Sequence, residues 1–185
     1  MNARPSPSKA GRSSRVHDGN IYLVGFMGAG KTSVGQRLAE ILQWDFVDLD
    51  VEIEKREGRP IREIFSTEGE PHFRRLESEE LQRVSGCRRT VVALGGGAFV
   101  DERNRELVAK TGTSVWLDAS METLYSRCGE DPLRPLASSR GEMERLLERR
   151  RPFYGLAAIR IEVAGLSIDE IARGIRDAIN RESGP

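Results

Sequence analysis

The 185-residue chain has few cysteines, no long apolar run and no net charge. Cys87 and Cys128 are its only cysteines, and their spacing fits neither a disulfide framework nor a CxxC metal or redox site. No apolar run approaches the ~18 residues that a membrane span needs. The formal charge of +0 gives no general attraction to nucleic acid or to anionic membranes. We therefore expect a cytoplasmic enzyme with neither nucleic acid nor a membrane as partner.

The length fits one domain, which we expect at residues 20–183 and in monomeric form. Residues 1–19 contain Pro, Ser, Gly and Arg with almost nothing to bury, which predicts a disordered tail. An organelle transit peptide is the alternative for such an Arg- and Ser-rich stretch. The stretch lacks the apolar core of a secretory signal, so no secretion signal is expected.

Short β-branched runs alternate with amphipathic segments from Ile21 onward. The runs are IYLVG, DFVDL, TVVAL, TSVWL and RIEV, and they are typical of buried parallel strands. Apolar residues share one helical face twice: Val34, Leu38, Ile41 and Leu42, and later Ile168, Ile171, Ile175 and Ile179. The alternation predicts an α/β fold with a central five-stranded parallel sheet flanked by helices.

A glycine-rich loop follows the first apolar run. Gly25, four further residues and Gly30-Lys31-Thr32 match GxxxxGK[ST], with a strand before the loop and a helix after it. Its backbone N–H groups and the following helix N-terminus suit phosphate oxygens. Lys31 would reach the β/γ-phosphates and Thr32 would hold Mg²⁺. This motif predicts a kinase-type phosphate loop.

Two aspartates, Asp48 and Asp50, stand where the second strand is expected to end. At the carboxyl edge of a parallel sheet they would face the ligand crevice, where one could serve a metal and the other accept a hydroxyl proton. The alternative is that Asp50 only caps the following helix. The residues by themselves leave both interpretations open.

Further polar and glycine clusters follow these aspartates. Arg74 lies on an expected helix with Glu77 three residues beyond it, whereas Arg75 is expected to face solvent. The third strand ends in Gly95-Gly96-Gly97, which allows the backbone to approach a small ligand closely. A mobile turn is the alternative for the glycines.

These motifs, in this order, resemble the shikimate kinase family from about Ile21 to the last helix. That family combines a phosphate loop, a DxD, an FRR, a triple glycine, an arginine-bearing lid and R-x-P-x-Y. The matching residues are Asp48-Leu49-Asp50, Phe73-Arg74-Arg75, Gly95-Gly96-Gly97, Arg134 in DPLRPL, and Arg150-Arg151-Pro152-Phe153-Tyr154. The resemblance implies a three-layer P-loop kinase fold with a short mobile lid at about 129–141.

The resemblance also implies an activity: ATP-dependent phosphorylation of a shikimate hydroxyl to shikimate 3-phosphate, in aromatic amino acid biosynthesis, with Mg²⁺ as cofactor. Asp50 would be the base, aided by Lys31 and Arg134. The implied ATP-binding residues are Gly28, Ala29, Gly30, Lys31, Thr32, Ser33, Arg127 and Arg134. The implied shikimate-binding residues are Asp50, Arg74, Gly95, Gly96, Gly97 and Arg150, with Thr32 and Asp48 at the metal. Without nucleotide, solvent exposure is the alternative for Arg127 and Arg134.

Two other functions compete with this one. Another small-molecule kinase of the same fold, for gluconate or a nucleoside monophosphate, is the nearer alternative. The triple glycine argues against a base pocket, and the DxD with FRR argues against gluconate. A catalytically inactive nucleotide-binding module is the second alternative, against which stand the intact residues Lys31, Asp50, Arg74, Arg134 and Arg150.

Overall fold

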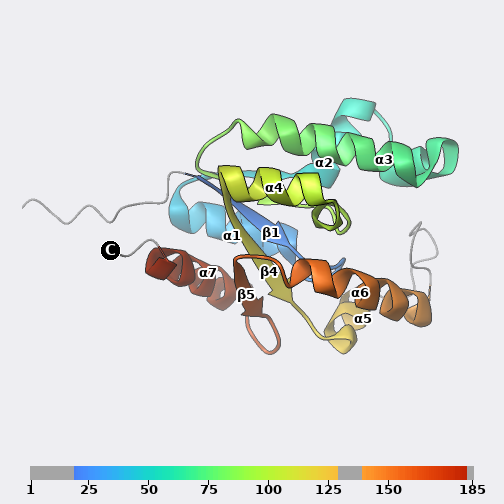
Figure 1. Ribbon diagram of the computed structural model, residues 1–185. Helices are drawn as coiled ribbons and strands as arrows, with labels where there is room; N and C mark the ends of the chain where they lie inside the picture. The colour runs from blue at the N-terminus through green and yellow to red at the C-terminus, as the bar shows by residue number, and fades with distance from the viewer. Residues whose placement is uncertain (1–18, 129–138, 183–185) are drawn as a thin grey trace, which may run out of the picture.

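The computed structural model describes residues 19–128 and 139–182 (Figure 1). The strands are β1 (Asn20–Val24), β2 (Asp45–Asp48), β3 (Thr90–Ala93), β4 (Gly112–Asp118) and β5 (Ile159–Glu162). The helices are α1 (Lys31–Leu42), α2 (Leu49–Glu57), α3 (Ile61–Ser85), α4 (Glu102–Thr111), α5 (Met121–Cys128), α6 (Arg140–Tyr154) and α7 (Ile168–Glu182), with a 3-10 turn η1 (Ala98–Val100). The predicted tail lies almost wholly outside the described residues. So does most of the predicted lid, whose last residues belong to α6 and its cap at Ser139.

All five predicted strands form, and they build one parallel sheet in the order β2-β3-β1-β4-β5. Every residue of β1 and β3 is buried, because helices cover both faces of the sheet. The carboxyl ends of β1, β2 and β3 meet at one edge of the sheet. The glycine-rich loop follows β1, Asp48 ends β2 with Asp50 just beyond it, and the triple glycine follows β3, so the topology gathers the predicted motifs at this edge.

The helices flank the sheet as the sequence predicts. In Figure 1, α3 and α4 lie above the strands and α7 below them, and α7 packs against α1. The predicted apolar face of α7 is confirmed at Ile171, Ile175 and Ile179 but is wrong at Ile168, which is 47% exposed because it begins the helix. Within residues 19–128 and 139–182, no helix combines the length and apolarity needed to cross a membrane.

Helix α3 is interrupted at Gly69, about a third of the way along its length. Gly69 has φ 79° and ψ 173°, which is not helical and which a residue with a side chain rarely adopts. The segments on either side, 61–68 and 70–85, bury a small apolar cluster that is separate from the main core. This outer cluster consists of Ile53, Ile64, Phe73 and Leu76, with Ile61 and Phe65 partly buried against it.

The packing of α1 on the sheet predicts a contrast between two helical glycines. A Cβ at Gly35 in α1 would lie 2.4 Å from Phe46 Cε2, whereas nothing lies within 4 Å of a Cβ at Gly174 in α7. We expect Gly35→Ala to lower the free energy of unfolding by about 1–3 kcal/mol through overpacking. Gly174→Ala should be neutral or stabilising by up to about 1 kcal/mol. Urea unfolding measures both, and equal stability of the two variants would contradict the packing described.

Candidate active site

The glycine-rich loop joins β1 to α1 in the way that anion-binding loops do. Gly28 and Gly30 have φ values of 77° and 94°, which only glycine adopts readily. Gly30 is the N-cap of α1, and among the described residues no side chain accepts from the first N–H groups of this helix. Those donors and the helix dipole therefore face the crevice and suit the oxygens of a phosphate.

Lys31 lies inside this loop. Its Nζ donates to the carbonyl oxygens of Gly25 at 2.9 Å and Phe26 at 3.0 Å. Burial lowers the pKa of Lys31, and the nearby carboxylates of Asp50 and Asp48 partly oppose this effect. These two hydrogen bonds hold the ammonium group beside the glycine-rich loop.

The remaining predicted nucleotide residues surround the same loop. Ala29 is buried, while Thr32 and Ser33 are exposed at the start of α1. Arg127 is exposed on α5 and reaches back to the loop, with Nη1 3.4 Å from the carbonyl oxygen of Gly28. Arg134, the predicted lid arginine, lies outside the described residues.

Asp48 connects the loop to the end of β2. Its Oδ2 accepts from the Thr32 hydroxyl at 2.7 Å, and its Oδ1 accepts from the Asp50 backbone N–H at 3.1 Å. The alternative that Asp50 caps α2 is therefore wrong, because Asp48 is the N-cap. The hydroxyl of Thr32 and the carboxylate of Asp48 are hard oxygen donors, which is the ligand type that Mg²⁺ takes beside phosphate. This pair fits the predicted metal.

Two adjoining cavities meet at Asp50. The first, here the phosphate-loop cavity, has about 280 Å³ and is lined by Met27, Gly28, Gly30, Lys31, Thr32, Ser33, Asp48, Asp50 and Leu94. The second, here the arginine pocket, has about 180 Å³ and is lined by Met27, Asp50, Ile61, Phe65, Phe73, Arg74, Glu77, Gly96, Gly97 and Arg150. A larger cavity of about 660 Å³ lies at the amino ends of the strands, but no predicted site residue lines it. Size alone therefore does not identify the site.

The side chains of Asp50 and Glu77 bring two buried carboxyl groups to the floor of the arginine pocket. A Cβ on Gly95 would lie 2.8 Å from Asp50 Oδ1 and 2.1 Å from Glu77 Oε1, so both oxygens converge on this glycine. Neither oxygen has a hydrogen-bond partner among the described residues. Burial raises the pKa of Asp50 to about 6, with a further rise from Asp48, and burial raises the pKa of Glu77 to about 7 against the opposing charge of Arg74.

Arg74 is aimed by two carboxylates of its own helix. Its Nη1 donates to Glu77, and its Nε and Nη2 donate to Glu70 Oε1 at 3.1 and 2.8 Å. These bonds use three of the five N–H donors of a guanidinium and leave one on each Nη. A Cβ on Gly97 would lie 2.3 to 2.6 Å from three guanidinium atoms, so only glycine leaves room for Arg74 there.

Helix α6 contributes Arg150 to the same pocket. Arg150 is 7% exposed, and its Nη1 lies 3.3 Å from the position of a Cβ on Gly96. Tyr154, one turn later, donates from its hydroxyl to the Gly96 carbonyl oxygen at 2.5 Å. Burial raises the pKa of Tyr154 to about 12, so the phenol keeps its proton and remains a donor. One helix thus fixes both an arginine and the central glycine.

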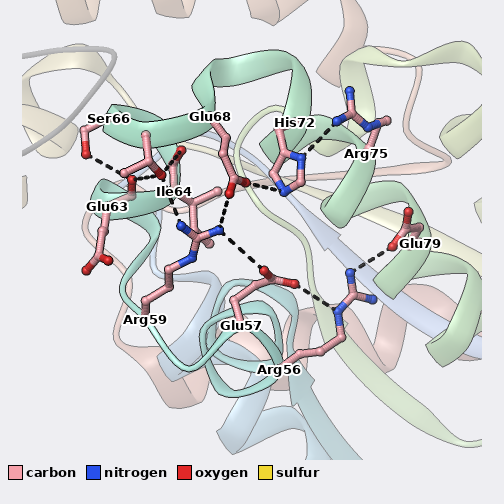
Figure 2. Close-up of polar contacts among 11 residues, drawn as sticks. Arg56, Glu57, Arg59, Glu63, Ile64, Ser66, Glu68, His72, Arg75 and Glu79 are labelled. Atoms are coloured by element: carbon pink, nitrogen blue, oxygen red, sulfur yellow. Dashed lines mark hydrogen bonds and ion pairs between the residues drawn. The ribbon is translucent and has the colours of Figure 1, made fainter.

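Sequence reasoning missed part of this site. It gave no role to Glu70, to Tyr154 or to the apolar wall formed by Ile61, Phe65 and Phe73. The spacing Arg150–Tyr154 carried a signal, because residues four apart share a helix face. The expected solvent exposure of Arg75 is confirmed, and its Nη2 lies 2.9 Å from Nδ1 of His72 (Figure 2).

Comparison with known proteins finds relatives along most of the chain. The model of the family described as "Shikimate kinase" matches residues 27–180. A shikimate kinase of Persephonella marina is 46% identical over 157 residues, which are 84% of this chain and 96% of the relative. A shikimate kinase of Moorella thermoacetica is 44% identical over 163 residues, which are 87% of this chain and 94% of the relative.

Solved structures give the same result and show how widely the fold is shared. Shikimate kinase from Acinetobacter baumannii, in complex with shikimate, has a TM-score of 0.85 at 38% identity and covers 89% of this chain and 94% of its own. A gluconokinase from Sinorhizobium meliloti has a TM-score of 0.57 at 20% identity, covering 92% of this chain and 100% of its own, and is similar in fold alone.

The raised pKa of Glu77 predicts a pH dependence of the ligand-free protein. A carboxyl whose pKa rises from 4.5 to about 7 on folding binds its proton more tightly when folded, so its contribution to stability falls as pH rises through that range. Between pH 4.5 and 8 the wild type should lose up to about 3 kcal/mol relative to Glu77→Gln. Urea unfolding at several pH values measures the difference.

The control is Glu79→Gln, which changes an exposed carboxylate of the same helix. Its free energy of unfolding should follow the wild type across the same pH range. If Glu77→Gln also follows the wild type in parallel, Glu77 titrates in its ordinary range and the burial described above has no electrostatic consequence.

Proposed function

This chain belongs to the shikimate kinase family, and we propose that it transfers the terminal phosphate of ATP to a hydroxyl of shikimate, giving shikimate 3-phosphate and ADP for aromatic amino acid biosynthesis. The observation that carries this proposal is the position of Asp50, which lines both the phosphate-loop cavity and the arginine pocket. Direct transfer between two bound molecules requires such a shared boundary.

The arginine pocket would take the shikimate. Shikimate is a ring with one carboxylate and several hydroxyls, so its site needs cations at one end and hydrogen-bond acceptors at the other. Arg74 and Arg150 would hold the carboxylate, and Gly95, Gly96 and Gly97 let the backbone and these arginines approach the ring. The apolar wall would cover the ring carbons.

Asp50 would bond the reacting hydroxyl and accept its proton. Its buried Oδ1 lacks a partner, and a pKa near 6 leaves the group mostly ionised above pH 7 while making it more basic than an ordinary aspartate. Lys31 would stabilise the charge of the transferred phosphate from the loop side. We assign the same task to Arg134 from the lid, as the family resemblance implies.

The phosphate-loop cavity would take ATP. The N–H groups of Gly28, Ala29, Gly30, Lys31, Thr32 and Ser33 would surround the phosphates, with Arg127 beside them. When bound, Mg²⁺ supplies positive charge at the phosphate oxygens, and Thr32 and Asp48 would hold it. We further propose a monomer in the cytoplasm with shikimate and ATP as its partners, and with neither nucleic acid nor a membrane.

The test of this function is ADP release by the purified protein with a panel of acceptors. We expect turnover with shikimate and little with gluconate or nucleoside monophosphates. ADP release with gluconate but not shikimate would replace the proposal with the rival kinase. ATP binding by calorimetry, without turnover on any hydroxy acid, would support the inactive nucleotide-binding module.

Removal of the proposed base predicts a large loss of rate. Asp50→Asn keeps the size and removes the charge, so kcat should fall by roughly 10²–10⁴, the range of general-base contributions. Steady-state kinetics with saturating shikimate and ATP measures kcat, and calorimetry checks that ATP still binds. Turnover close to the wild type would exclude Asp50 as the proton acceptor.

The close approach of Gly97 and Arg74 predicts a selective effect on one substrate. Gly97→Ala would force the guanidinium from its position, so KM for shikimate should rise about tenfold or more while KM for ATP changes by less than about twofold. Gly174→Ala, which has open space around it, is the matched control and should leave both constants unchanged. A similar rise in both KM values would indicate a general folding defect instead.

A further inference from the structure

The apolar wall of the arginine pocket depends on a short helical segment, residues 61–68, here called the wall segment. Its Ile61 and Phe65 line the pocket. The non-helical backbone at Gly69 separates it from segment 70–85, which carries Phe73 and Arg74 of the same pocket. A continuous helix would fix the two segments by its backbone hydrogen bonds, but this break removes that constraint.

Side chains span the break instead, and Glu68 lies at their centre (Figure 2). Its Oε1 accepts from Arg59 Nη2 at 2.7 Å, and its Oε2 lies 2.6 Å from Nε2 of His72. Arg59 belongs to the connection between α2 and α3, and His72 to the segment beyond the break. One carboxylate therefore joins three stretches of chain at the end of the wall segment.

The neighbouring contacts determine the role of each partner. Arginine only donates, so the 2.9 Å contact of Arg75 Nη2 with His72 Nδ1 makes that nitrogen an acceptor, and Nε2 then donates to Glu68. Arg59 also donates from Nη1 to the Thr67 hydroxyl at 3.1 Å. Each oxygen of the Glu68 carboxylate thus accepts a hydrogen bond, one from Arg59 and one from His72.

We propose that Glu68 is a positioning residue for the acceptor substrate: by joining Arg59 to His72 across the break at Gly69, it holds Ile61 and Phe65 against the arginine pocket. This inference rests on the proposed function for the identity of that acceptor. The side chains of Glu68, Arg59 and His72 are partly exposed, at 36, 24 and 28%. Partly exposed ion pairs of this kind contribute little to the free energy of unfolding. We therefore expect the loss of Glu68 to change the binding of shikimate more than the global stability.

Glu79 offers a matched control on the same helix. It is a carboxylate bound by one arginine, Arg56, at 2.8 Å, and Figure 2 shows that only the longer ion pairs of Glu57 link this arginine to Arg59. It lies beyond the break and, among the described residues, makes no hydrogen bond or ion pair with residues 61–68. Glu79→Gln therefore removes the same charge without touching the proposed contact.

The kinetic experiment compares Glu68→Gln with Glu79→Gln. For Glu68→Gln we expect KM for shikimate to rise about fivefold, equivalent to about 1 kcal/mol, while KM for ATP and kcat stay within about twofold. Glu79→Gln should leave all three constants within about twofold of the wild type. Arg59→Met should reproduce the effect, and the double variant Arg59→Met/Glu68→Gln should be no worse than either single variant.

Hydrogen exchange provides a second readout that does not depend on turnover. Without ligand, amides of residues 61–68 should exchange faster in Glu68→Gln than in the wild type, while Glu79→Gln exchanges at the wild-type rate. An unchanged KM for shikimate, or equal effects of Glu68→Gln and Glu79→Gln, would overturn the proposal. If the wild type does not phosphorylate shikimate, the proposed function fails, and exchange alone decides whether Glu68 holds the wall segment.

Discussion

The contact between Arg74 and Gly97 is the constraint on which the arginine pocket depends. The Arg74 guanidinium occupies the space that the Cβ of any other residue at position 97 would need. The absence of a side chain on Gly97 therefore makes room for this cation. The two carboxylates that hold Arg74 come from its own helix, and Tyr154 fixes the neighbouring Gly96 from α6. The turn at Gly96 and Gly97 therefore contacts both α3, through Arg74, and α6, through Tyr154, at one pocket.

The buried carboxyl oxygens give this pocket a chemical preference. A buried acceptor without a partner costs about 1–3 kcal/mol, and both Asp50 Oδ1 and Glu77 Oε1 are in this state among the described residues. A ligand rich in hydroxyl groups can donate to such oxygens, whereas an apolar ligand cannot. The site thus gives up some stability of the ligand-free protein for hydrogen bonds that a polyhydroxylated ring would complete.

The sequence predicted the sheet and the phosphate loop well, because short buried strands and GxxxxGK[ST] are local patterns. The positions of the aspartates and of the triple glycine after predicted strands suggested a site but left alternatives open, and only the resemblance to a family gave Asp50, Arg74 and the glycines definite roles. The sequence could not give the reason for the glycines, since the atoms that exclude a Cβ at Gly95 and Gly97 come from α2 and α3. Asp48 rather than Asp50 caps helix α2, because the helix begins at Leu49, two residues earlier than the alternative assumed.

With the acceptor in the arginine pocket, as we propose, specificity for it comes from side chains of α2, α3 and α6 rather than from the fold. A gluconokinase shares this fold, so the fold alone does not determine the acceptor. Several side chains of the arginine pocket come from the two segments of α3, which Gly69 separates and which polar contacts connect. These segments pack on a small apolar cluster that is separate from the main core. Such a region can change its substrate through a few side chains while the main core stays intact, because the two clusters share no buried residue.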